Sequence, residues 1–181
     1  MASNKVKYGL KNVHYAVYTP GTDTYATPVA IPGGVNLSLT PEGESNTFYA
    51  DNVAYYVTQA DQGYSGDLEI ATIPDQMRKD VWGWTTDSNN VLIEDNQAAV
   101  KNFALLFQIN GDAYNRHCVL YMCSAARPNI NAATIGEQAE PQTETIALTA
   151  MPRTDGKVQA VTLDTTTASV VSGWYNAVYT G

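Results

Sequence analysis

Phe103-Ala-Leu-Leu-Phe-Gln-Ile109 is an almost unbroken apolar run. It is followed by the turn residues Asn110-Gly111-Asp112 and by a second run, Arg116-His-Cys-Val-Leu-Tyr-Met-Cys-Ser124. Successive side chains of a strand point to opposite sides of a sheet, so a strand that is apolar at every position is buried on both faces. The Asn-Gly turn joins the two runs. We therefore predict a β-hairpin whose first strand is buried on both faces.

Most of the remaining chain also has the pattern of strands. Apolar and polar residues alternate over several short stretches, and β-branched and aromatic residues, including twelve tyrosines, suit a pleated surface. The stretch 64–70 carries two acids on its polar face. The strands predicted in addition to the hairpin cover 13–18, 35–40, 64–70, 144–150 and 158–163.

Two segments have helical spacing instead. Ile73, Met77 and Val81 recur at i, i+4 and i+8, and a proline and an aspartate stand where a helix begins, so we predict a short α-helix over about 74–82. Val170, Trp174 and Val178 repeat the spacing near the end of the chain, although a glycine weakens it. We expect one domain, 1–181, with long loops at 19–34, 41–52, 85–99 and 128–140.

The composition is acidic and poor in charge. The chain of 181 residues has a net charge of -8, and only 15% of its residues are charged. There is no Lys or Arg between Lys11 and Arg78, while eight acids fall in that interval. This balance argues against a protein that holds nucleic acid. The acids are either a solvated surface or a surface that repels an anion, and the sequence leaves both interpretations open.

No catalytic, cofactor-binding or metal-binding set can be assembled from the sequence. There is no glycine-rich phosphate loop, the two histidines lack the partners of a zinc site, and no apolar run is long enough to span a membrane. Cys118 and Cys123, five residues apart on one predicted strand, point to opposite faces and cannot form a disulfide. Carboxylate pairs such as Glu42/Glu44 and Asp67/Glu69 are more typical of an acidic surface than of a glycosidase. We expect no enzyme and no membrane insertion.

Several stretches, in order along nearly the whole chain, resemble the major tail protein (tail tube protein) family of long-tailed, non-contractile bacteriophages. The stretches that carry the resemblance are Tyr8-Gly-Leu-Lys-Asn-Val-His-Tyr15, Ser38-Leu-Thr-Pro-Glu-Gly-Glu-Ser45, Phe48-Tyr-Ala-Asp-Asn-Val-Ala-Tyr-Tyr56, Gly63-Tyr-Ser-Gly-Asp-Leu-Glu69, Ile73-Pro-Asp75, Phe103-Ala-Leu-Leu-Phe107, Ala126-Arg-Pro128 and Glu140-Pro-Gln-Thr-Glu-Thr145. The resemblance implies a mainly β fold, a β-sandwich of two roughly orthogonal antiparallel sheets with a flanking short α-helix.

The resemblance also implies a function. Subunits of this family form hexameric rings that stack into a hollow tube around a tape-measure protein, between tail initiator and terminator proteins, and DNA later passes through the lumen. The expected location is the virion, after assembly in the host cytoplasm. The same subunit fits the tube of a phage-derived bacteriocin. A β-sandwich binding module that recognises carbohydrate or a cell surface is the alternative from another class.

Candidate site residues follow from placing the predicted strands in such a tube. If the strands 35–40, 64–70 and 142–150 line the lumen, their polar faces nominate Asp67, Glu69 and Glu144 as lumen-facing acids. The predicted loop 41–52 is assigned to contacts between subunits or rings. Its candidate residues are Glu42, Glu44, Phe48, Tyr49 and Asp51, joined by Tyr55 and Tyr56 as aromatic anchors unless these aromatics are core residues.

Overall fold

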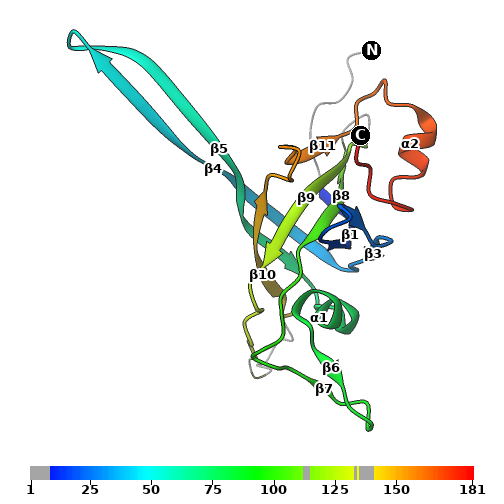
Figure 1. Cartoon of the computed structure of the whole chain (residues 1–181). Coiled ribbons are helices and arrows are strands. Elements are labelled where there is room, and N and C mark those ends of the chain that lie inside the picture. The colour runs from blue at the N-terminus through cyan, green and yellow to red at the C-terminus, as the bar shows by residue number, and fades with distance from the viewer. Residues whose placement is uncertain (1–8, 112–114, 133, 135–140) are drawn as a thin grey trace.

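The structure is a computed structural model that describes residues 9–111, 115–132, 134 and 141–181. Within those residues the fold is mainly β, with antiparallel sheets and a short flanking helix, as predicted (Figure 1). The elements in chain order are β1 (Gly9–Thr19), β2 (Thr24–Tyr25), β3 (Val29–Ala30), β4 (Gly34–Ala50), β5 (Val53–Ile70), α1 (Asp75–Trp82), β6 (Thr85–Thr86), β7 (Leu92–Ile93), β8 (Phe103–Asn110), β9 (His117–Ala125), β10 (Glu144–Met151), β11 (Gln159–Val161) and α2 (Ala168–Ser172).

The main sheet is one continuous hydrogen-bonded path. Its strand order is β2-β1-β8-β9-β10-β5-β4, with β3 and β11 paired to the side, while β6 and β7 form a separate small sheet. The β8–β9 hairpin predicted from the sequence lies in the middle of this path. Inner-face residues from six of its strands belong to one core, so the sheet curves around that core and its halves face each other.

Helix α1 covers the core at one end. Met77, Val81 and Trp82 are buried against the sheet, and Trp82 Nε1 donates to the carbonyl oxygens of Ala125, at 3.2 Å, and Ala126, at 3.0 Å. The helix begins after Pro74 and ends at Gly83, whose φ of 70° is the left-handed conformation that glycine adopts at helix ends. The predicted helix over 74–82 is thereby confirmed within one residue.

A second, smaller core lies on the other face of β1, β8 and β9. The C-terminal segment covers this face, and Trp174 is buried there beside Leu106 and Val119. Burial from both sides explains the unbroken apolar run of β8: Phe103 and Leu105 belong to the first core, and Ala104 and Leu106 to the second. The predicted C-terminal helix is short, because α2 ends before Gly173.

The prediction of a loop over 41–52 is wrong, because residues 41–50 are the distal part of β4. They pair with β5, and together the two strands form a long hairpin that projects from the body (Figure 1). Pro41 and a glycine suggested a loop, but β4 is the last strand of the sheet, where a residue without an N–H is tolerated. Asp51 and Asn52 form the turn with φ of 52° and 61°, as a tight type I′ turn requires.

The other predicted loops are only partly irregular. Segment 19–34 contains β2 and β3, and segment 85–99 contains the β6–β7 hairpin. Of segment 128–140, residues 133 and 135–140 lie outside the described residues, and 128–132 contain neither helix nor strand. Cys118 and Cys123 are both buried on β9, and no disulfide joins them.

Candidate assembly surface

The outer face of β10, β5 and β4 is not covered by any other described part of the chain. Three cross-strand rows run over it, because residues paired directly across neighbouring antiparallel strands share a face. We call these nine residues the bare face. The rows are Thr145–Glu69–Asn36, Ala147–Asp67–Ser38 and Thr149–Ser65–Thr40. Most of these side chains are exposed, and Glu69 and Ser65 are half-buried.

The bare face combines small polar side chains with carboxylates. Asp67 and Glu69 stand two residues apart on β5 and therefore point to the same side. Thr143 Oγ1 donates to Glu69 Oε1 at 2.6 Å, and the Ser65 hydroxyl donates to Glu42, which brings a third carboxylate to the edge of the face. The strands β4, β5 and β10 contain no Lys or Arg. The three strands therefore present a surface of small polar side chains that is negatively charged. No Lys or Arg on these strands compensates the charge.

Glu144 does not lie on the bare face with the two other nominated acids. On β10 its side chain points to the same side as those of the buried residues Ile146 and Leu148. It accepts a hydrogen bond from the backbone N–H of Ile73 and forms an ion pair with Arg78, at 3.1 Å. It thus fastens the start of α1 to the sheet. The prediction that the three acids share one strand face is wrong for Glu144, because β10 places that residue one position out of phase.

The hairpin beyond the body, residues 43–61, is called the arm. It begins at an irregularity in the pairing of β4 with β5, beside Gly63, whose φ of 105° no ordinary side chain adopts easily. A Cβ at Gly63 would also overlap the backbone carbonyl of Ala150 on β10. Gly63 therefore allows β5 to leave the sheet and continue into the arm.

The arm exposes large apolar side chains to solvent. Phe48 and Tyr56 are directly paired across the two strands, and each is 63% exposed, while Tyr55 is 77% exposed. Core packing within the chain is thereby excluded for these aromatics. The exposed apolar set of the arm is Phe48, Tyr49, Val53, Tyr55, Tyr56 and Val57. Glu44, Asp51 and Asp61 supply its charge, and Asp51 stands in the turn at its tip.

A two-stranded hairpin of this kind has no core of its own. Hairpins without a third strand or a packed face are marginally stable in water, and contiguous apolar patches mark interaction sites. The arm therefore has the character of a surface that is covered in an assembly.

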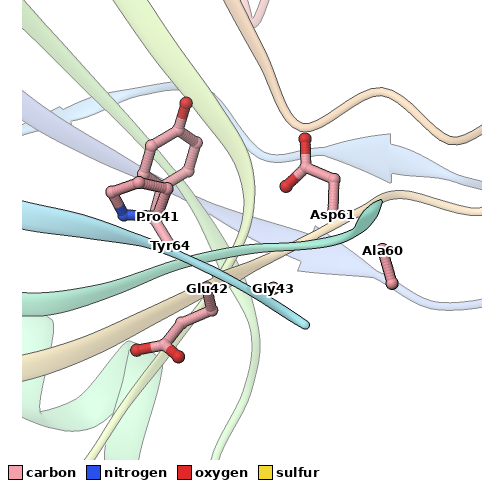
Figure 2. Close-up of a pocket in the computed structure, with 6 residues that line it drawn as sticks. All are labelled: Pro41, Glu42, Gly43, Ala60, Asp61 and Tyr64. Atoms are coloured by element: carbon pink, nitrogen blue, oxygen red, sulfur yellow. The ribbon is translucent and has the colours of Figure 1, made fainter. Parts of the chain in front are cut away.

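A hollow lies at the base of the arm. It has a volume of about 430 Å³ and is lined by Pro41, Glu42, Gly43, Ala60, Asp61 and Tyr64. Figure 2 shows the carboxylates of Glu42 and Asp61 pointing away from one another. Among the described residues, no cluster of His, Cys, Asp or Glu could hold a metal ion. Nor does any helix in the described ranges have the length and apolar character needed to cross a membrane.

Sequence reasoning brought together part of this surface and missed part of it. It found Asp67, Glu69 and the aromatics of the arm, but not the threonine row of β10 beside β5. The alternation of Thr145, Ala147 and Thr149 between buried residues carried that signal. The pair Asp51-Asn52, which favours a tight hairpin turn, was the signal for the arm.

Comparison with known proteins finds similarity in structure but not in sequence. No protein family model matches the chain, and no curated protein matches it in sequence. The chain is similar to a solved chain described as "Cryo-EM structure of the anti-feeding prophage cap (AFP tube terminating cap)", with a TM-score of 0.46 and 8% sequence identity over 87% of this chain and 93% of that one. We draw no functional conclusion from this similarity.

Proposed function

We propose that this protein is the structural subunit of a phage-type tail tube and has no catalytic activity. In this proposal it assembles into hexameric rings that stack around a tape-measure protein, between initiator and terminator proteins, as a component of the virion. The observation that carries the proposal is the junction of two surfaces on one hairpin. Strands β4 and β5 hold the bare face within the body and then extend into an apolar arm.

The bare face fits the wall of a channel for DNA. Positively charged contacts retain DNA in a salt-dependent manner, because each one releases counterions from the phosphates. A face of small polar residues with Asp67 and Glu69, on strands without Lys or Arg, provides no such contact. DNA would therefore move past it without being held. The acids of this face then have a use beyond solubility.

The arm fits a contact with another copy of the chain. Its apolar side chains would be buried on association, and burial of aromatic residues dominates the energy of most protein interfaces. The open edge of β4 would also be covered when neighbouring subunits close the sheet into a barrel. The tube of a phage-derived bacteriocin uses the same subunit chemistry, and the presence of DNA in the particle distinguishes the two.

Assembly is tested by electron microscopy and light scattering of the purified chain over a concentration series, alone and with the initiator complex. We expect rings or hollow tubes from the natural chain. Phe48→Ser and Tyr55→Ser should remain monomeric with an unchanged melting temperature, because both side chains are exposed in the monomer. Val91→Ser, at a side chain 55% exposed on the loop between β6 and β7, is the matched control and should still assemble. A monomer that persists with the initiator would favour the binding-module alternative.

The channel assignment is tested separately with Asp67→Lys and Glu69→Lys. Tubes of these variants should assemble but retain double-stranded DNA at low salt and release it as salt rises. Asp164→Lys changes an exposed acid outside the bare face by the same charge and should not retain DNA. DNA passage and infectivity that stay normal in the Asp67 and Glu69 variants would overturn the assignment of the bare face to the lumen.

A further inference from the structure

Both histidines of the chain contact the C-terminal segment. The ring of His14, on β1, stacks on Tyr175 with 4.3 Å between ring centroids and 28° between ring planes. The ring of His117, on β9, lies 5.6 Å from Tyr175 and 6.0 Å from Trp174. The only side chains with an ordinary pKa near neutral pH thus meet at one segment, although they are about a hundred residues apart in sequence.

The segment concerned, residues 168–181, is a cover over the second core. Val170, Trp174 and Val178 pack against an apolar face of the sheet, and Trp174 is 2% exposed. Its polar links to the described residues outside it include a hydrogen bond from Lys157 Nζ to the carbonyl oxygen of Thr180, at 3.0 Å, and backbone hydrogen bonds from Val170 and Val171 to Thr167. The cover is therefore held mainly by apolar and aromatic contacts. A charge on a group beneath it would weaken these contacts.

His117 is poorly placed to carry a charge. Its Nδ1 is buried and has no hydrogen-bond partner, and burial lowers the pKa of this imidazole. The groups around it are Gln108, paired with it from β8, Thr162, whose hydroxyl accepts its backbone N–H, its strand neighbours Arg116 and Cys118, and the rings of Trp174 and Tyr175. None of these groups is a carboxylate that could compensate an imidazolium.

His14 is in a different position, although it contacts the same tyrosine. Its Nδ1 lies 2.9 Å from the carbonyl oxygen of Asn12, at an exposed site. This hydrogen bond requires a proton on Nδ1 and persists when the second nitrogen is protonated as well. A charged imidazole stacked on the face of a phenol ring is also favourable. The contacts of His14 with Asn12 and Tyr175 therefore do not require an uncharged ring.

We propose that residues 168–181 are an acid-released cover and that protonation of His117 releases them. The sign follows from linkage: the closed state binds fewer protons at His117 than the open state, so opening becomes more favourable as the pH falls below about 6.5. The effect stops growing below the lowered pKa of the closed state. Opening exposes the apolar face that contains Leu106, Val119 and Tyr121. This inference is independent of the proposed assembly function.

Hydrogen exchange of the full chain at pH 7.5 and pH 5.0, corrected for the intrinsic pH dependence of exchange, tests the proposal. Peptides covering 170–181 should lose protection at pH 5.0, by about tenfold for each unit by which the pKa differs between the closed and open states. Peptides of β8 report global unfolding and should keep their protection. His117→Gln, which cannot be protonated, should keep the cover closed at both pH values. His14→Gln should behave like the natural chain.

Three results would overturn the proposal. The first is a cover that stays equally protected at both pH values in the natural chain. The second is acid release that persists in His117→Gln or disappears in His14→Gln. The third is a cover that is already open at pH 7.5 in both His117→Gln and His117→Phe, because the imidazole would then be a packing group rather than a proton sensor.

Discussion

Replacing Glu144 with alanine should separate a structural carboxylate from the acids of the bare face. Glu144 accepts a hydrogen bond from the backbone N–H of Ile73 and pairs with Arg78 at 3.1 Å, and the Glu144 and Arg78 side chains are 31% and 18% exposed. Hydrogen bonds to a charged group contribute about 1.5–3 kcal/mol each, and partial exposure reduces that figure. We therefore expect Glu144→Ala to lower the free energy of unfolding by about 2–3 kcal/mol.

The assay is thermal and denaturant unfolding followed by circular dichroism. For a domain of this size, 1 kcal/mol corresponds to about 2–4 °C in the melting temperature, so the expected decrease is about 4–12 °C. Asp67→Ala is the control, since an exposed side chain on the bare face should change stability by less than about 0.5 kcal/mol. A double-mutant cycle with Arg78→Met should give a coupling energy of about 0.5–3 kcal/mol.

The reasoning would be refuted if Glu144→Ala were as stable as Asp67→Ala. An unchanged stability would mean that the contacts of Glu144 with α1 are replaced by water at no cost. The assignment of Glu144 as the residue that fastens the start of α1 to the sheet would then lose its basis. Glu144→Gln keeps one acceptor oxygen without the charge, so its free energy of unfolding should lie between those of Glu144→Ala and Asp67→Ala.

Three further outcomes are expected. Gly63→Ala should lower the free energy of unfolding, measured by thermal unfolding, by about 2 kcal/mol or more, because the positive φ and the adjacent carbonyl of β10 exclude a Cβ. Gly156→Ala is the control, since Gly156 also has a positive φ but open space around it, and the difference between the two variants gives the steric part of the loss. Trp82→Phe should lower the free energy of unfolding measured with denaturant by about 1–3 kcal/mol, because the buried carbonyl group of Ala125 and the partly buried one of Ala126 lose the indole N–H. Arg153 hydrogen-bonds Asp155 and lowers the pKa of that carboxyl to about 2, so this contribution to stability is present above about pH 4 and is lost as the pH falls toward 2. Asp155→Asn should therefore make the acid limb of the stability curve shallower, and an unchanged limb would contradict this assignment.

Some of the candidate surface could be predicted because its determinants are local. The alternation over 64–70 places Asp67 and Glu69 on the polar side of a strand wherever that strand lies in the fold. The spacing of Ile73, Met77 and Val81 defines the buried side of α1 in the same way. The assignment of aromatics near 48–56 to contacts between subunits remains a proposal, but their exposure follows from the structure alone.

The errors have one physical cause, which is pairing between distant segments. Segment 41–52 lacks the alternation of a half-buried strand because the arm has no buried face, so hydrophobic pattern contains no information about it. Its strand conformation comes from the hydrogen bonds to β5. The role of Glu144 depends on the helix start at Ile73 and on Arg78, which are about seventy residues away.

By itself, the sequence determined the β class, the doubly buried strand 103–109, the position of the first helix and the absence of positive charge from β4, β5 and β10. Each of these depends on residue type or on spacing along the chain. Only the tertiary structure decided that the C-terminal segment covers one half of the outer sheet surface and leaves the other half bare. It also decided that β4 and β5 continue into an arm and that two distant histidines meet at Tyr175. These features depend on which strands become neighbours, and that choice is made by burial and hydrogen bonding across the whole chain.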